Sequence, residues 1–103
     1  MKIVGVAACT SGIAHTYIAK EKLLSAAKEL GHEIQVETQG TIGTEDALTE
    51  KNIKEADIVI IAADIKISGK ERFHGKKIVE VPTHVVIKSP KALINKIQAD
   101  LGL

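Results

Sequence analysis

The sequence predicts an α/β fold of three layers, a four-stranded parallel sheet in the order 2-1-3-4 with helices on both faces, of the Rossmann-like kind. Residues 2–8 and 58–63 are apolar runs without polar alternation, which is typical of parallel strands buried on both faces. Segments with helical periodicity alternate with the strands, and right-handed crossovers then leave few topologies. The length of 103 residues predicts one domain, spanning residues 1–103.

The first half of the chain gives a buried strand, a helix and a second strand. Residues 2–8 form the first strand, and a helix follows over residues 16–30, with Thr16 as its N-cap and Gly31 as its stop. Residues 34–38 alternate apolar and polar, which predicts an edge strand. A loop over residues 39–44 comes next.

The second half contains the most hydrophobic run and ends in a helix. Thr49 caps a short helix over residues 50–55, with Asn52 facing outward. The remaining elements follow in order: a central strand at 58–63, a loop at 64–69, a helical turn at 70–73, a strand at 77–80, a loop or helical turn at 82–87, and a helix from Ser89-Pro90 to about Leu101.

The predicted topology places a ligand site at the carboxyl ends of the strands. The crossovers reverse direction between the first and third strands, and ligands bind at such a switch point. Cys9, residues 39–43 and Asp64 all fall at those carboxyl ends. This convergence follows from topology and does not depend on the chemistry of the cysteine.

The chain's one cysteine, Cys9, lies where the first strand passes into a loop that leads to a helix. A helix N-terminus offers unpaired N–H groups that bind phosphate and stabilise a thiolate. Gly12 permits the backbone conformations of an anion nest. Cys9 is therefore either a buried small hydrophobe or a nucleophile that takes up a phosphoryl group.

Composition excludes several other classes. The formal net charge is +1 and the aromatic residues are Tyr17 and Phe73, which gives no basis for nucleic-acid binding. No apolar run approaches the roughly 20 residues that span a bilayer, so we expect a protein that is not itself embedded in a membrane. A single cysteine fits the reducing cytoplasm. The four histidines, His15, His32, His74 and His84, lack metal-ligand spacing, so no metal or organic cofactor is expected.

Several segments resemble one family. Residues 9–16, Cys-Thr-Ser-Gly-Ile-Ala-His-Thr, resemble the cysteine loop of the fructose-specific IIB components of the bacterial phosphoenolpyruvate-dependent sugar phosphotransferase system, or PTS. Residues 36–43 resemble the family's Val-Glu-Thr-Gln-Gly segment, and residues 62–64 and 71–76 also look familial. The chain departs from the pattern at Thr10, where proline is common, and at Tyr17, where phenylalanine is common.

The resemblance implies a phosphotransferase that works as a relay. A phosphohistidine of a IIA partner gives its phosphoryl group to Cys9, and Cys9 passes it to a sugar held by a membrane IIC partner, usually yielding fructose 1-phosphate. The protein would be cytoplasmic, associated with the inner face of the membrane through IIC. The sugar itself rests on the resemblance, and we expect a stand-alone subunit.

We assign candidate roles around Cys9 as follows. The phosphate-binding candidates are Thr10, Ser11, Gly12, Ile13, Ala14, His15 and Thr16, through backbone N–H groups and the hydroxyls of Ser11 and Thr16. Gln39 and Gly40 are candidates for a second wall. His15 either donates to a phosphoryl oxygen or ties down the loop.

Two other charged residues leave alternatives open. Asp64 either lies near Cys9 or caps the turn that follows it; we favour the cap, because a carboxylate beside a phosphoryl group would be repelled. Arg72 either receives a IIA or IIC partner or is solvated.

Two other functions remain as alternatives. Low-molecular-weight cysteine phosphatases, and arsenate reductases like them, place an arginine where this chain has His15, and no Asp-Pro pair supplies a mobile general acid. A phosphoryl group held without that clamp keeps its transfer potential, which favours a carrier. A non-catalytic binding module would tolerate loss of Cys9.

Overall fold

The computed structural model describes residues 1–9, 13–40 and 43–103. Its elements follow in this order: β1 (Lys2–Ala8), α1 (Ile13–Glu29), β2 (Glu33–Gly40), β3 (Gly43–Glu45), α2 (Glu50–Glu55), β4 (Ile58–Ala63), the 3₁₀ helix η1 (Lys70–Phe73), β5 (Ile78–Val81), α3 (Thr83–Lys88) and α4 (Pro90–Leu101).

The described residues form a five-stranded sheet in the order β3-β2-β1-β4-β5. Strands β2, β1, β4 and β5 are parallel, which confirms the predicted order of the four parallel strands. The predicted number of four strands in the sheet is wrong, because a fifth strand, β3, pairs antiparallel with β2, with Thr38 opposite Glu45. Strand β2 is therefore not an edge strand. Three residues are too few to show a period, so β3 gave no sequence signal.

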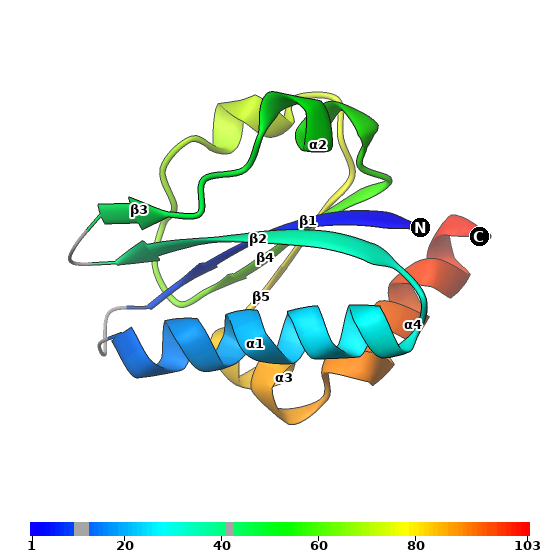
Figure 1. Ribbon diagram of the computed structural model, residues 1–103, viewed down its shortest axis with the longest axis horizontal. Helices are drawn as coiled ribbons and strands as arrows, with labels where there is room; N and C mark the ends of the chain where they lie inside the picture. The colour runs from blue at the N-terminus through cyan, green and yellow to red at the C-terminus, as the bar shows by residue number, and fades with distance from the viewer. Residues whose placement is uncertain (10–12, 41–42) are drawn as a thin grey trace.

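Helices cover both faces of the sheet (Figure 1), which confirms the three layers. Helices α1, α3 and α4 lie on one face, and α2 and η1 lie on the other. The first face holds a core that includes Leu23, Ile60 and Ile94, and the second holds one that includes Val6, Ile61 and Phe73. Alternate residues of β1 and β4 enter opposite cores, which explains why these strands are apolar without alternation.

Several element boundaries differ from the prediction. Helix α1 begins at Ile13, so Thr16 lies inside it and is not its N-cap. Thr49 does cap α2, accepting a hydrogen bond of 3.1 Å from the Asn52 N–H. The Asn52 side chain donates to Gln35 Oε1 at 2.8 Å, so it contacts β2 and does not face outward into solvent.

The β2–β3 hairpin is attached to helix α1 by two polar contacts. The Tyr17 hydroxyl donates to the Glu45 carboxylate, and Lys20 forms an ion pair with Asp46. Asp46 has a φ of 53°, in the left-handed region that aspartate tolerates better than most residues. These contacts hold the hairpin beside the N-terminal half of α1.

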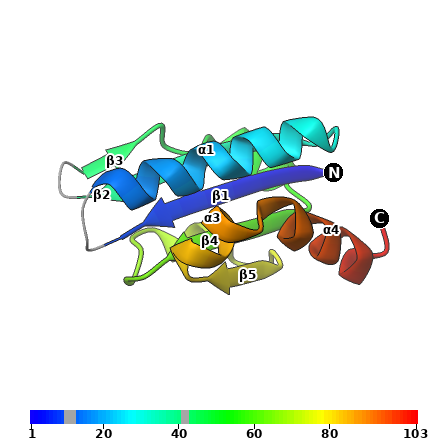
Figure 2. The same cartoon turned by 90° about the horizontal axis from the view of Figure 1, so that it is seen from below.

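Both termini lie at the end of the sheet opposite to Cys9 (Figure 2). Strand β1 begins beside the N-terminus and ends next to Cys9. Helix α4 leads the C-terminus back to the same end as the N-terminus (Figures 1 and 2). The carboxyl ends of the strands are therefore away from both chain ends.

Candidate functional site

Cys9 follows β1 directly and is 7% exposed. Helix α1 begins four residues later, so the positive end of its dipole lies near the thiol. The predicted phosphate-binding residues Thr10, Ser11 and Gly12 lie outside the described residues. Ile13, Ala14, His15 and Thr16 occupy the first turn of α1, not a loop. Strand β1 before Cys9 and helix α1 after it are both present, as the interpretation of Cys9 as a nucleophile requires.

The side chains of Asp64 and His15 approach the Cys9 sulfur. The Asp64 carboxylate, at the end of β4, has its Oδ2 3.2 Å from Cys9 Sγ, and His15 Nδ1 is 4.0 Å from the same sulfur. His15 itself is exposed at the start of α1. The structure therefore brings together Cys9, which follows β1, His15 in the first turn of α1, and Asp64, which follows β4.

Asp64 does not cap the turn that follows it, and the interpretation that we favoured from the sequence is wrong. Its Oδ1 accepts the Thr83 N–H at 3.0 Å and its Oδ2 accepts the Thr83 hydroxyl at 2.7 Å. Asp64 thus supports the first residue of α3 from a strand 19 residues earlier. Thr83 was not among the predicted site residues, and its position directly after Pro82 is the signal that marks a helix start.

The Asp64 carboxylate is held in its ionised form. The hydrogen bond from the Thr83 hydroxyl, and then that from the Thr83 N–H, lower the pKa of Asp64; burial opposes them, while Cys9 and the nearby His84 add to the lowering. An ionised carboxylate can only accept hydrogen bonds. The Cys9 thiol is therefore the donor in its contact with Asp64.

Thr16 and Thr38 present buried hydroxyls on the α1 side of the sheet. They are 4% and 2% exposed, and neither hydroxyl has a hydrogen-bond partner among the residues that the structure describes. Thr38 pairs with Ala7 in the register, two residues before Cys9. Most buried hydroxyl groups in proteins form a hydrogen bond, so these two are exceptions among the described residues. That Thr16 contacts phosphate remains a prediction.

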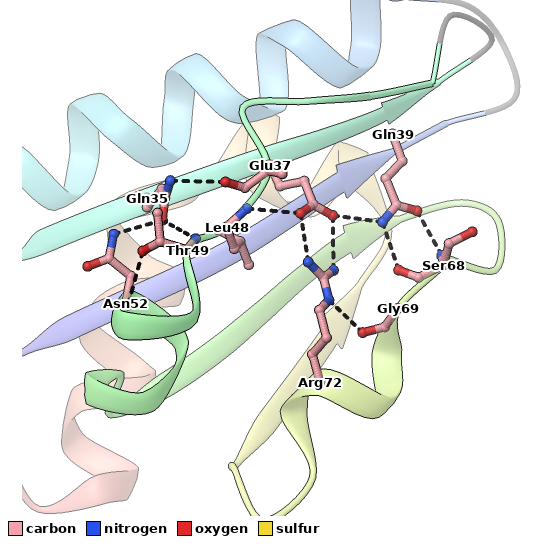
Figure 3. Close-up of polar contacts among 10 residues, drawn as sticks. Gln35, Glu37, Gln39, Leu48, Thr49, Asn52, Ser68, Gly69 and Arg72 are labelled. Carbon is pink, nitrogen blue, oxygen red and sulfur yellow. Dashed lines mark hydrogen bonds and ion pairs between the residues drawn. The ribbon is translucent and has the colours of Figure 1, made fainter.

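The residues predicted as a second wall, Gln39 and Gly40, lie at the end of β2. The Gln39 amide is fully engaged (Figure 3): its Nε2 donates to Glu37 and to the Ser68 carbonyl, and its Oε1 accepts the Ser68 N–H, all at 2.8 Å. Gln39 pairs with Ala8, so its side chain leaves the sheet on the α2 and η1 face. There it joins β2 to the segment after β4.

Glu37 is the centre of this network (Figure 3). It is 1% exposed and forms a two-pronged ion pair with Arg72 at 2.8 and 3.0 Å. The Leu48 N–H donates to the same carboxylate at 3.0 Å. The alternative in which Arg72 is simply solvated is wrong, because its guanidinium binds Glu37 and the Gly69 carbonyl.

The ion pair makes stability depend on pH in the acid range. Burial alone would raise the pKa of Glu37, but hydrogen bonds from Arg72, Gln39 and the Leu48 N–H outweigh it and lower the pKa below 4.5. A lowered pKa in the folded state means that the carboxylate stabilises the fold above about pH 4.5, and that this stabilisation is lost as the pH falls through the folded-state pKa.

We therefore expect urea unfolding of the wild type to show a steeper fall in stability below pH 4.5 than Glu37→Gln shows. Glu33→Gln, at the exposed start of the same strand, is the matched control and keeps the wild-type slope. Parallel curves for the wild type and Glu37→Gln would contradict this assignment.

The residues that the structure describes contain no group of three or more histidine, cysteine, aspartate or glutamate side chains placed to hold a metal ion. Within the same ranges, no helix has the length and apolar character needed to cross a membrane.

Comparison with known proteins identifies the family. Residues 4–96 match the family model described as the lactose/cellobiose-specific IIB subunit of the PTS. The fructose-like EIIB component 2 of Escherichia coli K12 is 51% identical over 98% of this chain and 95% of its own length. The fructose-specific EIIABC component of Bacillus subtilis is 46% identical over 92% of this chain, which corresponds to 15% of that longer protein.

Solved structures of PTS IIB domains have the same fold as this chain. A crystal structure of a domain from the fructose-specific IIABC component of Borrelia burgdorferi has a TM-score of 0.86 at 48% identity, covering 91% of this chain and 89% of that one. The solution structure of the Enzyme IIB subunit of the PTS from Escherichia coli K12 has a TM-score of 0.92 at 34% identity, covering 98% and 94%.

Fold, cysteine position and comparisons together define a phosphoryl-transfer subunit of the sugar PTS. The chain belongs to the IIB family of that system, which confirms the resemblance stated from the sequence. Of the relatives described above, one is named fructose-like and two are named fructose-specific.

Proposed function

We propose that this chain carries a phosphoryl group on Cys9 between two partner proteins. A IIA protein donates the group from a phosphohistidine, and a membrane IIC protein binds the sugar that receives it. The position of the Cys9 thiol, at the carboxyl end of β1 and before the N-terminus of α1, is the observation that carries this proposal. The partners follow from relatives whose names combine B with C, or A with B and C.

The finer assignments belong to the same proposal. Residues 1–103 act as one IIB domain in the cytoplasm, meeting the inner face of the membrane through IIC. The backbone N–H groups of residues 10–16 bind the phosphoryl oxygens. The sugar is fructose, because three of the relatives above are named as fructose-like or fructose-specific, although the matching family model is named for lactose and cellobiose.

The arginine content supports a carrier over a phosphatase or arsenate reductase. Arg72 is the chain's only arginine, and its guanidinium is bound to Glu37 on the α2 and η1 face. No other guanidinium exists to clamp a phosphoryl transition state beside Cys9. A phosphocysteine in this site lacks the group that cysteine phosphatases use to drive its hydrolysis.

The test is intact-mass spectrometry after incubation with phosphoenolpyruvate, the general PTS proteins and a fructose-type IIA. We expect the wild type to gain one phosphoryl group and Cys9→Ser to gain none. Because Cys9 is the only cysteine in the sequence, wild type alkylated with iodoacetamide is a second control, and it should also gain no phosphoryl group. Turnover of p-nitrophenyl phosphate, or a gain of mass in Cys9→Ser, would contradict the carrier.

A further inference from the structure

The contact between Asp64 and Cys9 has a fixed direction and a fixed geometry. The carboxylate receives the Thr83 N–H on Oδ1, and the Thr83 hydroxyl and the Cys9 thiol on Oδ2. Thr83 belongs to α3, which packs against α1. Two bonds from one residue hold the carboxylate so that it cannot swing away from the sulfur 3.2 Å from it.

This arrangement conflicts with charge once Cys9 is loaded. A phosphoryl group adds about 1.5 to 2 negative charges and removes the thiol proton that Asp64 accepts. The carboxylate then faces an anion instead of a donor, at a distance where like charges repel. A site that merely stored phosphate would place a donor at this position.

We infer that Asp64 is a positioning residue that accepts the hydrogen bond of the Cys9 thiol between transfers and makes the loaded phosphocysteine a stronger phosphoryl donor. The inference rests on the proposed function and deepens it. Thr83 serves the same end by holding the carboxylate in place. The role is electrostatic, so Asp64 is neither consumed nor covalently changed.

The two transfers balance without a proton on Asp64. In the first, the S–P bond forms, the N–P bond of the phosphohistidine breaks, and the thiol proton ends on the departing imidazole. In the second, the sugar oxygen bonds to phosphorus, the S–P bond breaks, and the proton of the sugar hydroxyl ends on the sulfur. The restored thiol donates again to Asp64, and this recovered hydrogen bond favours release of the phosphoryl group.

The experiment measures how the phosphoryl group distributes at equilibrium between a phosphorylated fructose-type IIA and this chain. In Asp64→Asn the side chain keeps its shape, its oxygen still accepts the Thr83 N–H, and its nitrogen donates where the carboxylate accepted. We expect the ratio of phosphocysteine to phosphohistidine to rise about tenfold, equivalent to ~1.4 kcal/mol. The shift is no larger because Asp64 is exposed and water screens its charge.

Asp57→Asn is the matched control. Asp57 lies directly before β4 and Asp64 directly after it. Asp57→Asn therefore removes the same charge at the opposite end of the same strand. The Asp57 carboxylate accepts the Lys2 N–H at 2.8 Å, a hydrogen bond that an asparagine oxygen also accepts. We expect Asp57→Asn to leave the distribution at the wild-type value.

A second variant and a second measurement keep the inference testable. Asp64→Ser also removes the charge, and unlike asparagine it places no amide donor beside the sulfur, so it should shift the distribution in the same direction. Without any partner, Asp64→Asn should react with iodoacetamide about tenfold faster than the wild type, because the Cys9 sulfur is no longer engaged in a hydrogen bond to the carboxylate.

The outcomes separate the two proposals. Equal distributions for the wild type and both Asp64 variants, or a shift toward phosphohistidine, would overturn the role of Asp64 while leaving the carrier intact. A wild type that accepts no phosphoryl group contradicts the proposed function; the alkylation rates then still decide whether Asp64 restrains the sulfur, and equal rates overturn it.

Discussion

Replacing Arg72 with alanine is expected to lower the free energy of unfolding by about 3 kcal/mol. The substitution leaves the Glu37 carboxylate, which is 1% exposed, without its two-pronged partner. Breaking a buried pair costs about 3–5 kcal/mol, and we expect the lower end because the Arg72 side chain is 29% exposed and water reaches the gap that it leaves. Urea unfolding at pH 7 measures the change.

A double substitution shows whether the stranded charge causes the loss. Adding Glu37→Gln to Arg72→Ala removes that charge, so the double variant should be more stable than Arg72→Ala alone. Arg72→Lys keeps the positive charge but loses the planar fork, and its cost should lie in between. A cost below about 1 kcal/mol for Arg72→Ala would mean that the pair behaves like an exposed one.

Replacing Phe73 with alanine is expected to cost about 3–5 kcal/mol. Phe73 is the largest of the fully buried side chains and is 1% exposed within the core beneath η1. Its ring also lies 4.9 Å from the Arg72 guanidinium carbon, a cation–π contact that steadies the ion pair. The substitution therefore opens a cavity in the core and removes the cation–π contact with Arg72.

Phe73→Leu is the matched control, since it keeps most of the buried volume but has no ring. We expect it to cost about 1.5 kcal/mol or less. Thermal and urea unfolding of both variants measure the difference. If Phe73→Ala costs no more than Phe73→Leu, the site collapses around the smaller side chain and the cavity argument fails.

The sequence was most informative where burial on both faces leaves a simple pattern. The apolar runs of β1 and β4 predicted the parallel strands, their order and the edge at which Cys9 lies. It was least informative for elements without a period. The three residues of β3 pair with β2, and the hairpin is held against α1 through Tyr17 and Lys20, contacts that no local pattern encodes.

Polar contacts between distant residues explain the other differences. Glu37 fitted an alternating edge strand, yet it is buried because Arg72, 35 residues away, neutralises it. The sequence argument favoured a capping role for Asp64 over a place beside Cys9, because it considered the phosphorylated state alone. In the unphosphorylated protein the thiol is a donor, and a carboxylate is a suitable acceptor for it.

Because the two chain ends lie at the same end of the sheet, a domain of this fold within a longer polypeptide has both of its linkers attached at that end. In the fused relatives the corresponding segment is 15–17% of the polypeptide, so it is tethered to much larger neighbours. Tethers attached at the end of the sheet away from Cys9 leave the reactive face unobstructed (Figure 2). A flexible tether also raises the effective concentration of each neighbour. A domain tethered in this way can rotate as a rigid body between a phosphoryl donor and a phosphoryl acceptor, without any change in its own fold.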